Sequence, residues 1–143
     1  MSAFIDLEFQ GLPRVIATAV IPVGGGVLLV DPGPTSCLPA LERGLAALSH
    51  TLADVKGLLL THIHLDHAGA SGTIARRVPG VPVYVHDVGA RHLAQPERLL
   101  ASATRLYGAD MDRLWGAFEA VPAASLHALS GGEALEVAGR RFE

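Results

Sequence analysis

The amino-acid sequence predicts an α/β protein in which helices cover the faces of a mainly parallel sheet. Short runs that are apolar nearly throughout occur at residues 26–31, 55–62 and 81–86. Such runs are typical of strands that are buried on both faces. Between them lie stretches whose apolar residues recur at helical spacing, and strands that alternate with helices favour this fold class. The length of 143 residues suits one domain spanning residues 1–143.

The first third of the chain contains a predicted hairpin and a predicted helix. The runs VIATAVIPV (15–23) and GVLLVD (26–31) are rich in β-branched and apolar residues, with glycines 24–26 as the turn between them. The segment DPGPT (31–35) ends the second run. Ser36 is predicted to be the N-cap of the helix that follows. The apolar face of that helix comprises Leu38, Leu41, Leu45 and Leu48.

The remaining elements continue the alternation. VKGLLLTH (55–62) and VPVYVH (81–86) are predicted strands, and GASGTIARRV (69–78) is a short helix between them. Residues 97–120 are predicted to be helical in two pieces, and we expect their aromatic stripe to be core packing. Residues 126–129 and 134–137 are predicted short strands, and 140–143 begin a further strand. The stripe comprises Tyr107, Met111, Trp115 and Phe118.

Composition excludes some classes of partner and compartment. The formal net charge is −3 and no run of like charge occurs, which argues against nucleic acid and anionic membrane surfaces as partners. Pro22 and the glycines interrupt the apolar run 15–30, so it is not a predicted membrane span. With one cysteine, the chain forms no internal disulfide. The first residues do not resemble a signal peptide, and a cytoplasmic location is expected.

The stretch THIHLDH (61–67) gathers three histidines and an aspartate at the end of a predicted strand. His62 and His64 are two residues apart, so in extended backbone they point to one side. Asp66 and His67 follow where the next helix begins, and they can face the same space. Imidazole nitrogen and carboxylate oxygen are common ligands of first-row metals, zinc above all. The pattern predicts a metal site, the alternative being a solvated loop in which Asp66 caps the following helix.

These residues resemble a known family. The pattern His-x-His-x-Asp-His, preceded by LLLT and followed by AGAS, is similar to the signature of the metallo-β-lactamase superfamily. Asp31-Pro32-Gly33 after GVLLV resembles the aspartate with which the family ends an early strand. The order of elements is similar to the first half of the family's four-layer αββα sandwich. The resemblance covers about residues 15–142.

The resemblance implies a dinuclear zinc hydrolase that acts on a small-molecule ester, thioester or lactone. His62 and His64 would hold the first ion, and Asp66 and His67 the second, with Asp31 orienting these ligands from behind. A metal-bound hydroxide would attack the carbonyl, and Asp66 would serve catalysis by orienting it and carrying a proton. Iron and manganese suit the same ligands. The diiron oxygen reductases, however, have a glutamate where this chain has His64.

The family's later ligands have no counterpart here. Its third histidine for the first metal lies in a Pro-Gly-His context, which this sequence lacks. We therefore expect residues 1–143 to be a domain truncated at its C-terminus: a fragment, half of a split protein, or an inactive relative. Each ion would then have two protein ligands. A second hypothesis is a non-catalytic metal-binding half-domain that associates with a complementary chain, or with itself through the incomplete sheet face.

Other histidines and the single cysteine have plainer structural roles open to them. His86, His92 and His127 could add metal ligands, but solvated or hydrogen-bonded histidines are the plainer interpretation. Cys37 falls in the first turn of a predicted helix, and a packed side chain is favoured over a nucleophile. The family resemblance also implies that residues 92–118 could form a wall of the substrate pocket.

Overall fold

The protein is built on a six-stranded sheet whose strands are neighbours in the order in which they occur along the chain. The computed structural model describes residues 1–143. The first three strands pair antiparallel, and the third to the sixth pair parallel, which confirms the α/β prediction and the hairpin at 15–31. The strands are β1 Ala3–Asp6, β2 Ala17–Val23, β3 Gly26–Val30, β4 Val55–Leu59, β5 Val83–His86 and β6 Leu126–Leu129.

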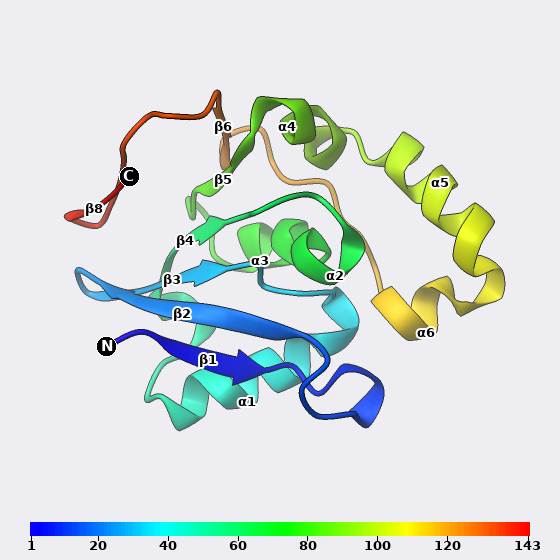
Figure 1. Ribbon diagram of the computed structural model, residues 1–143, viewed down its shortest axis with the longest axis horizontal. Coiled ribbons are helices and arrows are strands. Elements are labelled where there is room, and N and C mark those ends of the chain that lie inside the picture. The colour runs from blue at the N-terminus through cyan, green and yellow to red at the C-terminus, as the bar shows by residue number, and fades with distance from the viewer.

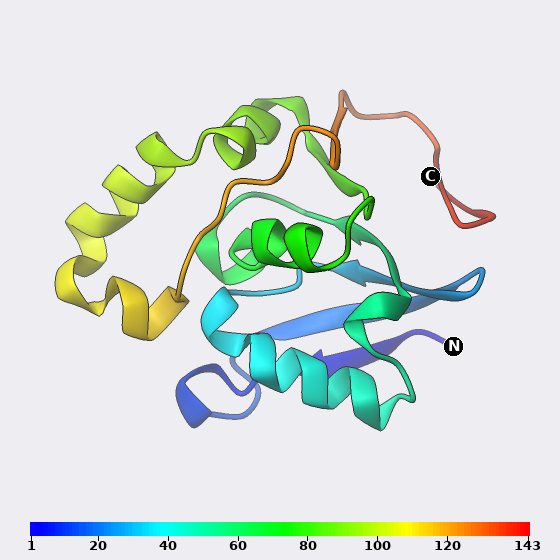
Figure 2. The ribbon, with the colours of Figure 1, turned by 180° about the vertical axis from the view of Figure 1, so that it is seen from behind.

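The helices fill the connections between the parallel strands. In the views of Figures 1 and 2, α1 and α3 lie across one face of the sheet, while α5 and α6 form an arm at its side. None of the helices has the length and apolar character needed to cross a lipid bilayer. The α-helices are α1 Leu38–Ala47, α2 Leu65–Ala68, α3 Ser71–Arg77, α4 Asp87–Ala94, α5 Glu97–Tyr107 and α6 Met111–Trp115. The 3-10 turns are Phe9–Gly11, Thr35–Cys37, Leu52–Asp54 and Gly108–Asp110.

The main core lies between the sheet and the helices. Successive residues of a strand point to opposite faces, so Val27 and Leu29 of β3 enter this core of 22 buried residues while Leu28 points the other way. Val83 and Val85 of β5 repeat the pattern. The predicted leucine face of the first helix is confirmed for three of its members, which are fully buried: Leu38, Leu41 and Leu45.

A short hairpin partly covers the opposite face of the sheet. Its strands are β7, Leu135–Val137, and β8, Arg140–Phe142, and they confirm the strands predicted near 134–143. Val137 packs with Leu28 and Tyr84 in a second, smaller apolar cluster. The amide of Gly24 donates a hydrogen bond of 3.0 Å to the carbonyl of Ala138. The hairpin is thereby tied to the turn between β2 and β3.

Three local expectations were wrong. Ser36 does not cap α1, since Cys37 is the N-cap residue and the Ser36 hydroxyl donates to the carbonyl of Leu114 at 2.6 Å. The strand predicted at 55–62 ends at Leu59, so the first two histidines of the cluster lie in a loop. Helix α4 was not predicted. Its sequence, DVGARHLA, mixes apolar and polar residues, and its buried side consists of Gly89, Ala90 and Leu93.

The aromatic stripe of residues 107–118 packs in the core only in part: Phe118 packs against the main core, whereas Tyr107 and Trp115 border a cavity. Tyr107 keeps 38% of its surface exposed. Trp115 is half-buried and stacks on Phe9, with ring centroids 5.4 Å apart. The stripe follows helical spacing, but α5 and α6 project beyond the sheet, so the face it forms borders a cavity.

Candidate metal centre

The histidine cluster lies at the carboxyl edge of the parallel strands, where open α/β sheets place their sites. Backbone hydrogen bonds fix the point at which the loop that carries the cluster leaves β4. The amide of Leu60 donates to the carbonyl of Tyr84 at 2.9 Å, and the amide of Asp31 donates to the carbonyl of Leu59 at 3.0 Å. His64 is the N-cap residue of α2, and its carbonyl accepts the amides of His67 and Ala68. The loop therefore ends in a fixed helical turn.

The structure brings the four predicted metal ligands together. The ring of His62 lies 4.7 Å from that of His64 and 4.1 Å from that of His67, measured between centroids. Nε2 of His67 lies 3.3 Å from Oδ2 of Asp66. Loop and helical turn thus place both halves of the motif around one space. In this structure no group of three His, Cys, Asp or Glu side chains is arranged to hold one ion in common.

Asp31 supports the cluster from behind. Its carboxylate accepts the amide of Thr61 at 2.8 Å and the Thr61 hydroxyl at 2.7 Å. Oδ2 also lies 2.9 Å from Nδ1 of His67. Asp31 is 8% exposed and has a φ of +53°, a left-handed conformation that costs energy for most residues and is tolerated by Asp and Asn. A carboxylate on Nδ1 leaves Nε2 of His67 free as a ligand atom.

The electrostatics of the cluster favour the neutral form of His62. Burial lowers the pKa of His62, and the neighbouring rings of His67 and His64 lower it further. The Thr61 hydroxyl lies 2.9 Å from Nδ1 of His62. An imidazole binds a metal only in its neutral form. The donor set of imidazole nitrogen and carboxylate oxygen fits zinc.

The remaining candidate histidines have other surroundings. Nδ1 of His86 accepts the amide of Val88 at 3.3 Å at the start of α4, and it lies 3.0 Å from Asp87. His86 and His92 both line a hollow of about 310 Å³ together with His62, but no three donors there are arranged to hold one ion. His127 lies beside Tyr84, whose ring packs in the cluster on the opposite face of the sheet. Cys37 is buried and 4% exposed, which agrees with a packed side chain.

A cavity of about 270 Å³ adjoins the cluster, and sequence reasoning had treated its wall as core. His64 and Asp66 line one side, and residues of α5 and α6 line the other. The segment 92–118 therefore does contribute a pocket wall, as the family resemblance implied. One feature of the sequence could have indicated this cavity wall. Leu106 and Tyr107 come directly before Gly108, and the sequence predicts no apolar element that would cover them.

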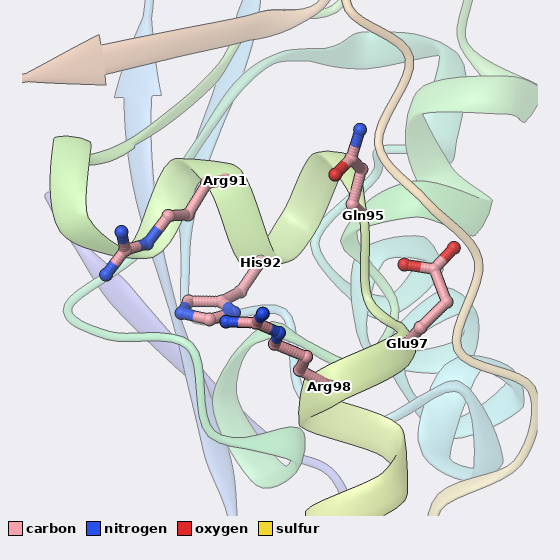
Figure 3. A pocket seen from close by; sticks show the side chains of 5 residues that line it. All are labelled: Arg91, His92, Gln95, Glu97 and Arg98. Atoms are coloured by element: carbon pink, nitrogen blue, oxygen red, sulfur yellow. The ribbon is translucent and has the colours of Figure 1, made fainter.

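A second hollow, of about 370 Å³, lies where α4 meets α5 and contains none of the cluster residues. Figure 3 shows its side chains projecting from the end of α4 and the start of α5. Neither Arg91 nor Arg98 forms an ion pair within the chain. Four of its five residues are exposed, which is typical of a solvated surface.

Comparison with known proteins agrees with this geometry. The family model of the metallo-beta-lactamase superfamily matches residues 12–142. FEZ-1 metallo-beta-lactamase from Legionella gormanii superposes with a TM-score of 0.70 at 19% identity, over 98% of this chain and 47% of that chain. A metallo-beta-lactamase family protein from Thermus thermophilus gives a TM-score of 0.69 at 29% identity, over 98% and 49%. The fold is therefore that of a metallo-beta-lactamase, and the chain belongs to the metallo-beta-lactamase superfamily.

Sequence relatives match over shorter stretches. The hydroxyacylglutathione hydrolase of Xylella fastidiosa is 40% identical over 73 residues, which are 50% of this chain and 25% of that protein. The probable metallo-hydrolase YqjP of Bacillus subtilis is 42% identical over 48 residues, or 32% and 15%. The chain thus spans about half the length of the solved structures and a smaller share of these relatives. Both relatives are named as hydrolases.

Proposed function

We propose that the protein is a zinc-dependent hydrolase of carboxylic esters, thioesters or lactones. The observation that carries the proposal is the arrangement of His62, His64, Asp66 and His67 within one loop and one helical turn, beside a cavity that a substrate can enter. The donor types fit zinc, and Asp31 holds one of the imidazoles in a defined orientation. Two ions, each shared by a pair of these residues, account for all four donors.

When bound to these residues, a zinc ion would supply a water of lowered pKa and a Lewis acid for a carbonyl. The chain's own residues supply position and proton handling. Asp66 is about two-fifths exposed at the cavity edge, so it can accept a proton from the attacking water and pass it to the leaving group. The Asp31–His67 contact fixes the tautomer of His67. The reaction requires no serine or cysteine nucleophile, and buried Cys37 does not face the site.

Zinc content and hydrolysis of this chain test the proposal together. We expect the purified protein to bind zinc and to hydrolyse members of an ester, thioester and lactone panel, and we expect both to fall in His64→Ala. His127→Ala is the matched control, because His127 is exposed on β6 and packs on the opposite face of the sheet. Unchanged hydrolysis in His64→Ala, or hydrolysis that survives removal of zinc, would contradict the proposal.

A second candidate function is zinc binding without hydrolysis. It is favoured by the finding that no three donors are arranged to hold one ion, since catalytic zinc sites usually have three protein ligands. In this case the protein would bind zinc through the same residues and show no hydrolysis above free zinc. The partly buried apolar side chains around the second cluster, among them Leu59, Leu129 and Phe142, would then serve association with a complementary chain or a second copy. A monomer in light scattering, across micromolar concentrations, would contradict that association.

A further inference from the structure

The cavity beside His64 and Asp66 is apolar on every side except at the cluster. Its far wall is made by α5 and α6, and six of its nine lining residues are hydrophobic. The cluster end carries the only titratable groups other than a tyrosine, and Ser102 is the one other polar side chain. Nothing in this wall offers a cation to a carboxylate or phosphate. The side chains that form the wall are Leu99, Ala103, Leu106, Tyr107 and Trp115.

The wall is held in place, so the cavity exists before a ligand enters it. The Ser36 hydroxyl donates to the carbonyl of Leu114 at 2.6 Å, and the side-chain amide of Gln10 donates to the carbonyl of Arg113 at 2.8 Å. Trp115 stacks on Phe9 and meets the ring of Tyr107 edge-on at 5.2 Å. These contacts attach α6 to the N-terminal part of the chain. Because the wall is already ordered, a ligand that enters the cavity does not incur the free-energy cost of ordering these side chains.

Two large apolar side chains of this wall remain exposed to solvent. Leu106 is 79% and Tyr107 38% exposed, although they lie on the side of α5 that borders the cluster. A ligand that covered them would gain the free energy of removing this surface from water. The volume of about 270 Å³ lies just under the range of roughly 300–1,000 Å³ common for drug-sized ligands. The cavity thus suits a medium-sized acyl or aryl group.

Building on the proposed hydrolase function, we infer that the substrate carries an uncharged apolar acyl or aryl group that lies in this cavity, with its scissile carbonyl at His64 and Asp66. A charged group lying along the α5–α6 wall would lose its hydration there, and no side chain of that wall supplies an opposite charge. The substrate class is therefore an apolar ester or thioester rather than one recognised by a charged portion in this cavity.

The chain's single tryptophan, Trp115, lines the cavity and reports binding by its fluorescence, independently of metal or hydrolysis. We would titrate the zinc-free protein with butanamide, hexanamide and octanamide, and with glutathione as a charged probe. We expect affinity to rise roughly two- to four-fold for each added methylene, since burying one methylene in full is worth about four-fold. Glutathione should cause no saturable change.

A matched pair of variants locates the binding. Leu106→Glu should weaken octanamide binding at least about ten-fold, because it places a charge in the apolar wall. Phe4→Glu should leave it unchanged, since Phe4 is 78% exposed on β1 and does not line the cavity. Affinity that is independent of chain length, a saturable response to glutathione alone, or equal effects of the two variants would overturn the inference. Graded binding without hydrolysis would instead contradict only the proposed function.

Discussion

The carboxylate of Asp31, at the end of β3, lies 2.9 Å from Nδ1 of His67, in the first turn after the histidine loop. The same carboxylate accepts both the amide and the hydroxyl of Thr61. The side chain of Asp31 therefore links the end of β3 to both ends of the histidine loop that follows β4. The geometry of the cluster depends on a residue outside the motif.

Replacing this carboxylate should weaken zinc binding. In Asp31→Asn the side chain keeps its shape and the left-handed backbone is tolerated, but the negative charge that polarises His67 is lost. Changes of this kind typically lower metal affinity roughly 10- to 100-fold. Competition with a chromophoric chelator measures the effect. Asp54→Asn is the control, since Asp54 also accepts the amide of a threonine, Thr51, but lies in a turn before β4. Equal affinities in the two variants would show that Asp31 does not orient a ligand.

A core substitution tests the packing of the sheet. Leu58 of β4 is fully buried in the main core. Leu58→Ala should lower the free energy of unfolding by about 2–5 kcal/mol, from lost burial and the cavity left behind. Urea denaturation followed by circular dichroism measures it. Leu12→Ala, at a site that is 59% exposed, should change stability by less than about 0.5 kcal/mol. If Leu58→Ala lowered the free energy of unfolding only slightly, β4 would not be a central strand of the packed core.

A glycine of α3 tests a close backbone contact. A Cβ built on Gly72 would lie 2.0 Å from the carbonyl oxygen of Glu119. Alanine is favoured over glycine inside a helix, but here the clash is with backbone that must move. Gly72→Ala should therefore destabilise the protein by about 1–3 kcal/mol, measured as a lower urea midpoint. Gly89→Ala is the comparison, because the nearest atom there belongs to the side chain of Ile63, which can shift more easily. A stabilised Gly72→Ala variant would disprove the contact.

The buried thiol of Cys37 should react slowly with alkylating reagents. Burial raises its pKa above the ordinary value, and the hydrogen bond with Ser36 opposes this only in part. The thiolate fraction at pH 8 is therefore smaller in the folded than in the unfolded chain. The resulting stabilisation is complete below the unfolded pKa and is lost as the pH rises through the folded value. Rates of iodoacetamide labelling at pH 8, with and without urea, measure the difference. Equal rates would place the thiol at the surface.

The features that the sequence predicts correctly are those set by residues close together in the chain. The strands at 26–31 and 81–86 are predictable because their side chains are buried on both faces, which leaves an unbroken apolar run. The four metal-ligand candidates are predictable because their spacing is local. Asp31 was expected beside them only from the family resemblance, and its contact with Thr61 is long-range. Ser36 misled because it bonds to Leu114, far along the chain, instead of its own helix.

The arm formed by α5 and α6 shows a different limit. Helical spacing identified both helices, but spacing alone does not tell a core face from a cavity wall. The distinction depends on what lies opposite, and for Leu106 and Tyr107 that is the histidine loop, some 40 residues earlier in the chain. Helix α4 was missed for the opposite reason. It is only eight residues long and its buried side consists mainly of small residues, so no row of large apolar side chains marks it, and it packs on β5 and β6.

The strand order β1-β2-β3-β4-β5-β6 has a consequence for how the molecule is made. Because each strand pairs with the strand synthesised just before it, the sheet can grow one strand at a time as the chain leaves the ribosome, without a later strand inserting between earlier ones. Asp31 is then already in place when the histidine loop emerges, and the arm of α5 and α6 closes over a loop that is already fixed. Assembly in this order leaves few unpaired inner strands exposed to aggregation during synthesis.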